Sequence, residues 1–153
     1  MKVLYDTGSD QLLIEGRDCK DCLGNRYDPN TSSYFFERSP IIKGIQYGTM
    51  IHLRGKPVQD EVCLKAFEYC MTPTQFQIIT QQYGIPEDID GILGLTQGSA
   101  PAGDFNMPDN FKPQTPNFMD TLFESGHITE KGFSTAFTGR FGDSFVDFGK
   151  GQI

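Results

Sequence analysis

Met1-Lys-Val-Leu-Tyr-Asp6-Thr7-Gly8-Ser9-Asp-Gln-Leu-Leu-Ile14 opens the chain, with three apolar residues on either side of a polar segment. This pattern predicts two buried strands joined by a tight turn. A carboxylate in such a turn lies beside a core, so Asp6 must be hydrogen-bonded, paired or partly exposed. Thr7 and Ser9 offer hydroxyl groups for this purpose, and Gly8 permits a tight turn. Asp-Thr-Gly alone is a common turn sequence, so its function depends on the rest of the chain.

The composition is that of a soluble globular protein that forms one domain. The chain has 153 residues, of which 37% are hydrophobic and 22% are charged, enough for one packed core. The 17 glycines, 9 prolines and 13 phenylalanines favour short strands and loops over helices. The net charge of -7 argues against nucleic acid or an anionic membrane as partner, because both bind basic surfaces. We see no signal peptide and no apolar run near the roughly 18 residues of a membrane span.

The four cysteines form two local pairs, Cys19 with Cys22 and Cys63 with Cys70. Two close pairs predict two local disulfides and therefore an oxidising compartment. A zinc site remains an alternative, but only the first pair has Cys-x-x-Cys spacing. A thioredoxin-like role for Cys19 and Cys22 is disfavoured, because no strand followed by a long helix surrounds them. We therefore expect no metal.

Turn residues and apolar periodicity divide the rest of the chain into short elements. We interpret residues 15–33 as a loop and residues 96–116 as a surface loop. Residues 34–71 are predicted to form two to four strands with a turn at 54–57, and two more strands are expected at 133–137 and 144–149. The best helix is predicted at residues 117–125. Asn117 suits a helix N-cap and Gly126 a helix end. The acidic residues at 87, 88 and 90 are interpreted as solvated surface. The chain is thus predicted to be mainly β, with one or two short helices.

Several of these segments, taken in order, resemble the amino-terminal lobe of a pepsin-like aspartic protease. The matching segments are Asp6-Thr7-Gly8-Ser9 with Leu12-Leu13-Ile14, Cys19 and Cys22 before Tyr27-Asp28-Pro29 and Ser32-Ser33, Tyr47-Gly48-Thr49, residues 90–95, the helix 117–125, Phe133-Ser134 and Asp147-Phe148-Gly149. Each motif is weak alone, but their order covers most of the chain. The resemblance implies one pepsin-like acid protease lobe, one of the two lobes of an aspartic endopeptidase (peptidase family A1).

The resemblance also implies roles for particular residues. Asp6 is one of two catalytic aspartates, which share a proton and activate one water for attack on a peptide carbonyl. Ser9 hydrogen-bonds the Asp6 carboxylate, and Thr7 and Gly8 fix the loop. Tyr47, Gly48 and Thr49 belong to the flap, the hairpin that closes over a peptide substrate. No cofactor is expected for this chemistry.

This sequence departs from the family pattern in ways that bear on activity. Asp6-Thr-Gly is its only Asp-Thr/Ser-Gly motif, and only five residues precede Asp6. We therefore expect residues 1–153 to be a single partial domain, a fragment that is inactive without a second lobe or a homodimer. Leu13 stands where the family usually has a tryptophan that bonds the flap tyrosine, and Met50 stands where the flap usually has glycine.

A non-catalytic peptide-binding module on the same scaffold is the alternative. The missing second aspartate and Leu13 favour it, whereas the intact Asp6-Thr-Gly-Ser9 segment disfavours it. The cysteines and the resemblance predict a secreted protein or one of a lysosome- or vacuole-like compartment. Asn30-Thr31-Ser32 is a glycosylation sequon, which matters only on the secretory route.

Overall fold

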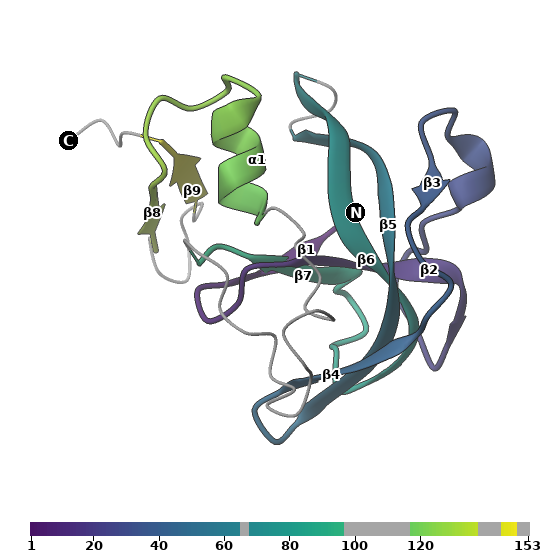
Figure 1. Ribbon diagram of the computed structural model, residues 1–153. Coiled ribbons are helices and arrows are strands. Elements are labelled where there is room, and N and C mark those ends of the chain that lie inside the picture. Colours follow the sequence, from purple (N-terminus) through teal and green to yellow (C-terminus); the bar gives the residue numbers. More distant parts are fainter. Residues whose placement is uncertain (65–67, 97–116, 138–144, 150–153) are drawn as a thin grey trace, which may run out of the picture.

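The computed structural model describes residues 1–64, 68–96, 117–137 and 145–149. Most of the expected loop 96–116, and the connection at 139–143, lie outside the described residues. The chain is mainly β, as predicted, and its strands form one large sheet and one small sheet (Figure 1).

The large sheet has seven strands with mixed directions. They are β1 (Val3–Asp6), β2 (Leu12–Lys20), β3 (Phe36–Glu37), β4 (Lys43–Tyr47), β5 (Ile51–Leu64), β6 (Tyr69–Tyr83) and β7 (Gly91–Gly94). Their order is β1-β7-β2-β6-β5-β3, and β4 pairs with β5 beside this path. The β1–β7 and β2–β6 pairs are parallel, whereas the other pairs are antiparallel. The strand that ends at Asp6 therefore lies at one edge of the sheet.

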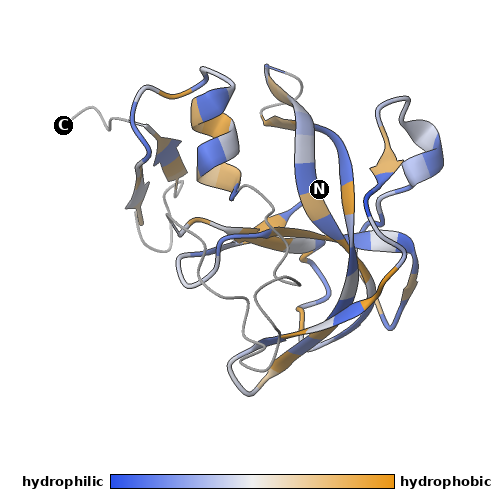
Figure 2. Cartoon of the chain, viewed as in Figure 1, coloured by the Kyte–Doolittle hydropathy of each residue, from blue (hydrophilic) through white to orange (hydrophobic). Residues whose placement is uncertain are grey.

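The apolar run after the Asp6 loop is buried on both faces of the sheet. Leu12 and Ile14 belong to a core shared with α1, whereas Leu13 belongs to a second core on the other face. Successive side chains of a strand point to opposite faces, so an uninterrupted apolar run is what a strand covered on both sides requires. Figure 2 shows the same concentration of hydrophobic residues along the central strands.

The predicted helix is present as α1 (Phe118–Glu124), on one side of the large sheet and next to the small one (Figure 1). Asn117 is its N-cap, with its side chain accepting a hydrogen bond from the Asp120 amide at 2.7 Å. The helix is followed by Gly126, whose φ of 73° suits glycine. The small sheet pairs β8 (Phe133–Ala136) with β9 (Phe145–Phe148), which confirms the predicted strand pair. A short 3₁₀-helix occupies Pro29–Thr31.

Two predictions of secondary structure were wrong. Residues 15–20 continue β2 instead of starting a loop, because pairing with β6 outweighs their polar composition. Residues 54–57 do not turn but lie inside β5. The register shifts between Arg54 and Gly55, and a Cβ at Gly55 would lie 3.1 Å from the Ile78 carbonyl oxygen. Glycine here marks a bulge and a close approach of two strands, not a turn.

Both predicted disulfides are formed. Cys19 bonds Cys22, and Cys63 bonds Cys70, so no cysteine is free. Cys63 and Cys70 are cross-strand neighbours in β5 and β6. Glu61 lies with this second pair, but metal ligation by cysteine requires a thiolate, which a disulfide does not offer.

Candidate active site

Asp6 is the last residue of β1 and faces the end of β7. Its Cα pairs with that of Gly94, and the Leu95 amide donates to the Asp6 carbonyl oxygen at 2.8 Å. The side chain of Asp6 is only partly exposed. The sheet therefore holds this carboxylate at a strand end, between the core and the solvent.

Backbone contacts from the end of β7 fix the loop that follows Asp6. The Gly94 amide donates to the Gln11 carbonyl oxygen at 2.9 Å, and the Thr96 amide donates to the Ser9 carbonyl oxygen at 2.9 Å. The Thr96 hydroxyl donates to the Thr7 carbonyl oxygen at 2.8 Å. These bonds come from a segment almost ninety residues away in sequence, so the loop geometry is a product of the fold.

The Asp6 carboxylate is oriented from within its own loop. The Gly8 amide donates to Asp6 Oδ1 at 2.9 Å. An aspartate side chain in a turn commonly accepts such a bond from the backbone amide two residues later. The expected bond from Ser9 to the carboxylate is not formed: among the described residues, Ser9 Oγ has no hydrogen-bond partner of ordinary geometry. Gly8 thus orients the carboxylate, whereas Thr7 and Ser9 fix the loop through their carbonyl oxygens, which accept from Thr96.

Tyr47 ends β4, and the turn that contains Gly48 and Thr49 leads into β5. Tyr47 pairs with Ile51 across the hairpin, and Gly48 has a φ of 54°, which glycine adopts readily. The Tyr47 ring is half-buried against the core that contains Leu13. The pKa of Tyr47 is raised to about 12, mainly by burial and to a lesser degree by the carboxylates of Asp6 and Asp10, against the lowering effect of the Ser9 hydroxyl. The fold therefore brings the hairpin and the Asp6 loop together.

Asp10 is a buried acidic residue that acts on Tyr47 and that the sequence interpretation did not name. Its side chain is buried, and burial raises its pKa. The available signal was its position between the Asp6 loop and the apolar run at 12–14, where a side chain has little access to water. Asp6 and Asp10 therefore place two carboxyl groups with different environments beside Tyr47.

The comparison with protein families agrees with this geometry. The model of the family described as eukaryotic aspartyl protease matches residues 1–151. The chain belongs to the eukaryotic aspartyl protease family. The match spans both sheets and α1. A search of curated proteins found no significant match.

Membership of the aspartyl protease family gives the chain an aspartic-type peptidase scaffold with peptide as the substrate class. The family and the two disulfides are compatible with a secreted or lysosomal compartment. Among the described residues, no helix has the length and apolar character needed to cross a membrane.

Proposed function

We propose that this chain is the amino-terminal lobe of an aspartic endopeptidase and that Asp6 is its catalytic carboxylate. The observation that carries the proposal is the position of Asp6, at the end of a sheet strand in a loop fixed by backbone bonds from β7. Catalytic groups are commonly held in this way by rigid elements. The family match supports the same assignment.

Peptide hydrolysis by this route needs two carboxyl groups. When two carboxylates lie close together only one ionises readily, so one acts as base toward a water and the other as acid. The water attacks the peptide carbonyl, and the protonated partner donates a proton as the bond breaks. In this chain Asp6 supplies one of the two groups, and the Gly8 amide at 2.9 Å orients it.

We propose that the hairpin formed by β4 and β5 closes over the bound peptide substrate. Tyr47, Gly48 and Thr49 would lie over a bound peptide and exclude water from the reaction. The position of Tyr47 supports the proposal, since its pKa is affected by Asp6. Gly48 and Thr49 are exposed at the hairpin tip and are therefore available for contacts with a substrate.

The second catalytic aspartate lies outside residues 1–153 in this account. Asp6-Thr-Gly is the only Asp-Thr/Ser-Gly motif in the sequence, and we therefore propose that the chain is a single partial domain. Its partner is a second aspartic protease lobe or, as a less favoured arrangement, another copy of the chain. A non-catalytic peptide-binding module is the alternative, favoured by the single motif and by Leu13 at the position of the family's tryptophan.

The test is cleavage of a denatured protein near pH 4 by the chain alone, over a range of concentrations, and by the chain mixed with a carboxy-terminal lobe of the same family. We expect cleavage on addition of the second lobe and its inhibition by pepstatin. A rate for the chain alone that rises faster than linearly with concentration would identify a dimer as the active form. A peptide-bound but inactive two-lobe complex would overturn the enzymatic proposal in favour of the binding module.

A further inference from the structure

Glu15 is a buried acidic residue that the proposed reaction does not use. It follows the apolar run in β2, and its exposed fraction is 1%. Its backbone is fixed on both sides, because its amide donates to the Asp90 carbonyl oxygen and its carbonyl oxygen accepts from the Tyr27 amide, each at 2.8 Å. The backbone that carries the buried carboxyl is therefore held in place by the fold.

The Glu15 carboxyl is incompletely hydrogen-bonded. Oε2 accepts from the Gly24 amide at 3.2 Å, whereas Oε1 is buried and has no hydrogen-bond partner among the residues that the structure describes. A buried anionic oxygen without a donor is far more costly than a neutral carboxyl in the same place. The immediate surroundings thus favour the protonated form.

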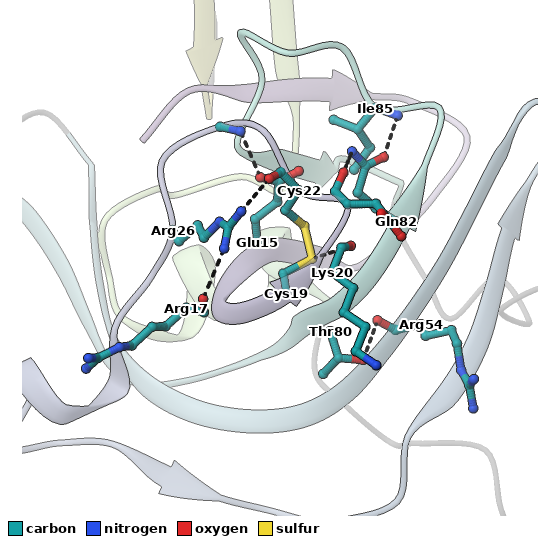
Figure 3. The surroundings of a disulfide bond; sticks show 12 residues. Glu15, Arg17, Cys19, Lys20, Cys22, Arg26, Arg54, Thr80, Gln82 and Ile85 are labelled. Atoms are coloured by element: carbon teal, nitrogen blue, oxygen red, sulfur yellow. Dashed lines mark hydrogen bonds between the residues drawn. A yellow bond between two sulfur atoms is a disulfide. The ribbon is translucent and has the colours of Figure 1, made fainter.

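Arg26 is the cation that acts on this carboxyl, but its hydrogen bonds within the described residues go to backbone carbonyl oxygens. Its guanidinium donates to the carbonyl oxygens of Cys22 at 2.6 Å and Arg17 at 3.4 Å. Figure 3 shows Glu15, Arg26 and the disulfide of Cys22 in one small region. Arg26 lowers the pKa of Glu15 through space, but it does not occupy the free oxygen.

Asp90, at the start of β7, is the anion that faces Glu15. It is 1% exposed and accepts hydrogen bonds from the amides of Lys2 and Asn25, both at 2.6 Å, and from the Asn25 side chain. Burial opposes its ionisation, but these donors and the terminal ammonium group outweigh burial and lower its pKa. On β6 the residue paired with Glu15 is the uncharged Ile79. Asp90 therefore stays ionised and repels a second negative charge.

We propose that Glu15 is a proton-binding site that stabilises the folded chain in acid and weakens it as the pH approaches neutrality. Burial is the main cause that raises the pKa of Glu15; Asp90 adds to it, whereas Gly24 and Arg26 oppose it. The folded chain therefore holds a proton that the unfolded chain releases near the ordinary glutamate value of about 4.3. This contribution is complete below that pH and is lost as the pH rises through the folded pKa.

Ionisation of Glu15 would act first on the segment that follows the Cys19–Cys22 disulfide. In that segment the Gly24 amide donates to the Glu15 carboxyl, and the Tyr27 amide donates to the Glu15 carbonyl oxygen. The adjoining residue Asn25 bonds Asp90, whose amide donates to the Lys2 carbonyl oxygen just before β1 and whose carbonyl oxygen accepts from the Glu15 amide in β2. The pH response thus reaches the strand that ends at Asp6 through Asp90, but it does not depend on the proposed catalytic role.

The first test compares urea unfolding of the unchanged chain, Glu15→Gln and the exposed control Glu124→Gln from pH 4 to pH 8. Glutamine resembles the protonated carboxyl, so Glu15→Gln should match the unchanged chain at pH 4 and become the more stable protein as pH rises. Between the two pKa values the ratio of their unfolding constants should change about tenfold per pH unit. A ratio that is as independent of pH as that of Glu124→Gln would overturn the proposal.

The second test uses the unchanged chain, so it does not require that any variant folds. The carbon NMR signal of the Glu15 carboxyl is followed with pH, together with hydrogen exchange of the Gly24 amide. We expect a Glu15 midpoint above about 4.3 and faster Gly24 exchange, beyond the intrinsic pH effect, above that midpoint. A midpoint at or below the ordinary value would contradict the proposal. Neither test uses a substrate, so each can fail while the peptidase proposal stands.

Discussion

Replacement of Gly94 by alanine tests whether the end of β7 holds the Asp6 loop by direct backbone contact. A Cβ at Gly94 would lie 2.5 Å from the Gln11 nitrogen and 2.6 Å from the carbonyl carbon and oxygen of Ser9. Ordinary contact begins at 3.4 Å, so the new atom is about 0.9 Å too close. All three contacts are with backbone, so no side-chain rotation can relieve them.

The expected cost follows from overpacking in a closed site. Added methyl groups that force backbone shifts typically cost about 1–3 kcal/mol, and Gly94→Ala should lie in the upper part of that range. Gly44→Ala is the matched control, because its Cβ would meet no atom of the described residues within 4 Å and its φ is not positive. That control should change the free energy of unfolding by less than about 1 kcal/mol.

Urea unfolding of the two variants at one pH measures this difference, and amide NMR shifts locate the disturbance. We expect the Gly94→Ala shifts to be largest in the Asp6 loop, at residues 7–11. Equal free energies of unfolding for Gly94→Ala and Gly44→Ala would refute the reasoning, since the close approach would then not constrain the loop.

Three further outcomes follow from hydrogen bonds of buried groups. Asn117→Ala removes the helix N-cap and should lower the free energy of unfolding by about 1 kcal/mol in urea; an unchanged value would mean that the cap bond is replaced by water. Tyr27→Phe removes a donor to the buried Asp60 carboxylate and should cost about 1–3 kcal/mol by the same measurement, whereas a neutral change would show that another donor replaces it. Asp90 has a lowered pKa, so its contribution to the free energy of unfolding is present above the ordinary aspartate pKa and is lost as pH falls through the folded pKa. Asp90→Asn should therefore lose stability chiefly above about pH 4. An equal loss of stability at about pH 2 would contradict this.

Much of the fold could be predicted because local pattern and tertiary structure agree. The apolar run after Asp6 is buried on both faces, and Asn117 and Gly126 bound the helix as their capping chemistry predicts. Residues 54–57 misled the prediction, because Gly55 and Pro57 are typical of turns but here belong to a bulged strand. Local propensity does not reveal which strand will pair with such a segment.

The sequence predicted the loop that carries Asp6, but it did not predict the hydrogen bonds that hold this loop. Asp6 and Tyr47 were named from the sequence, but the contact of Thr96 with Thr7 joins residues far apart in the chain. Asp90 was interpreted as solvated surface and is in fact buried and bonded to the Lys2 amide. That interpretation was wrong because an acidic cluster on a turn is polar in sequence, whereas the Lys2 amide that bonds Asp90 comes from the residue before β1, far away in the chain.

The burial of a carboxylate inside a strand could have been predicted from its position in the alternating pattern. Asp60 has the same parity along β5 as Val58 and Val62, both of which face the core that contains α1. A charge at an inward position of an alternating strand requires donors. Tyr27 and Ser32 provide them, but only the folded structure identifies which residues do so.

The most direct test of the central claim compares Asp6→Asn with the exposed control Asp88→Asn in the two-lobe cleavage assay near pH 4. Asparagine preserves the shape of the side chain and cannot exchange a proton with the attacking water. We expect Asp6→Asn to lower kcat/KM by about 10²–10⁴-fold or more, with pepstatin-sensitive activity retained by Asp88→Asn. If Asp6→Asn and Asp88→Asn cleave at the same rate in equally folded complexes, Asp6 is not the catalytic carboxylate of this lobe.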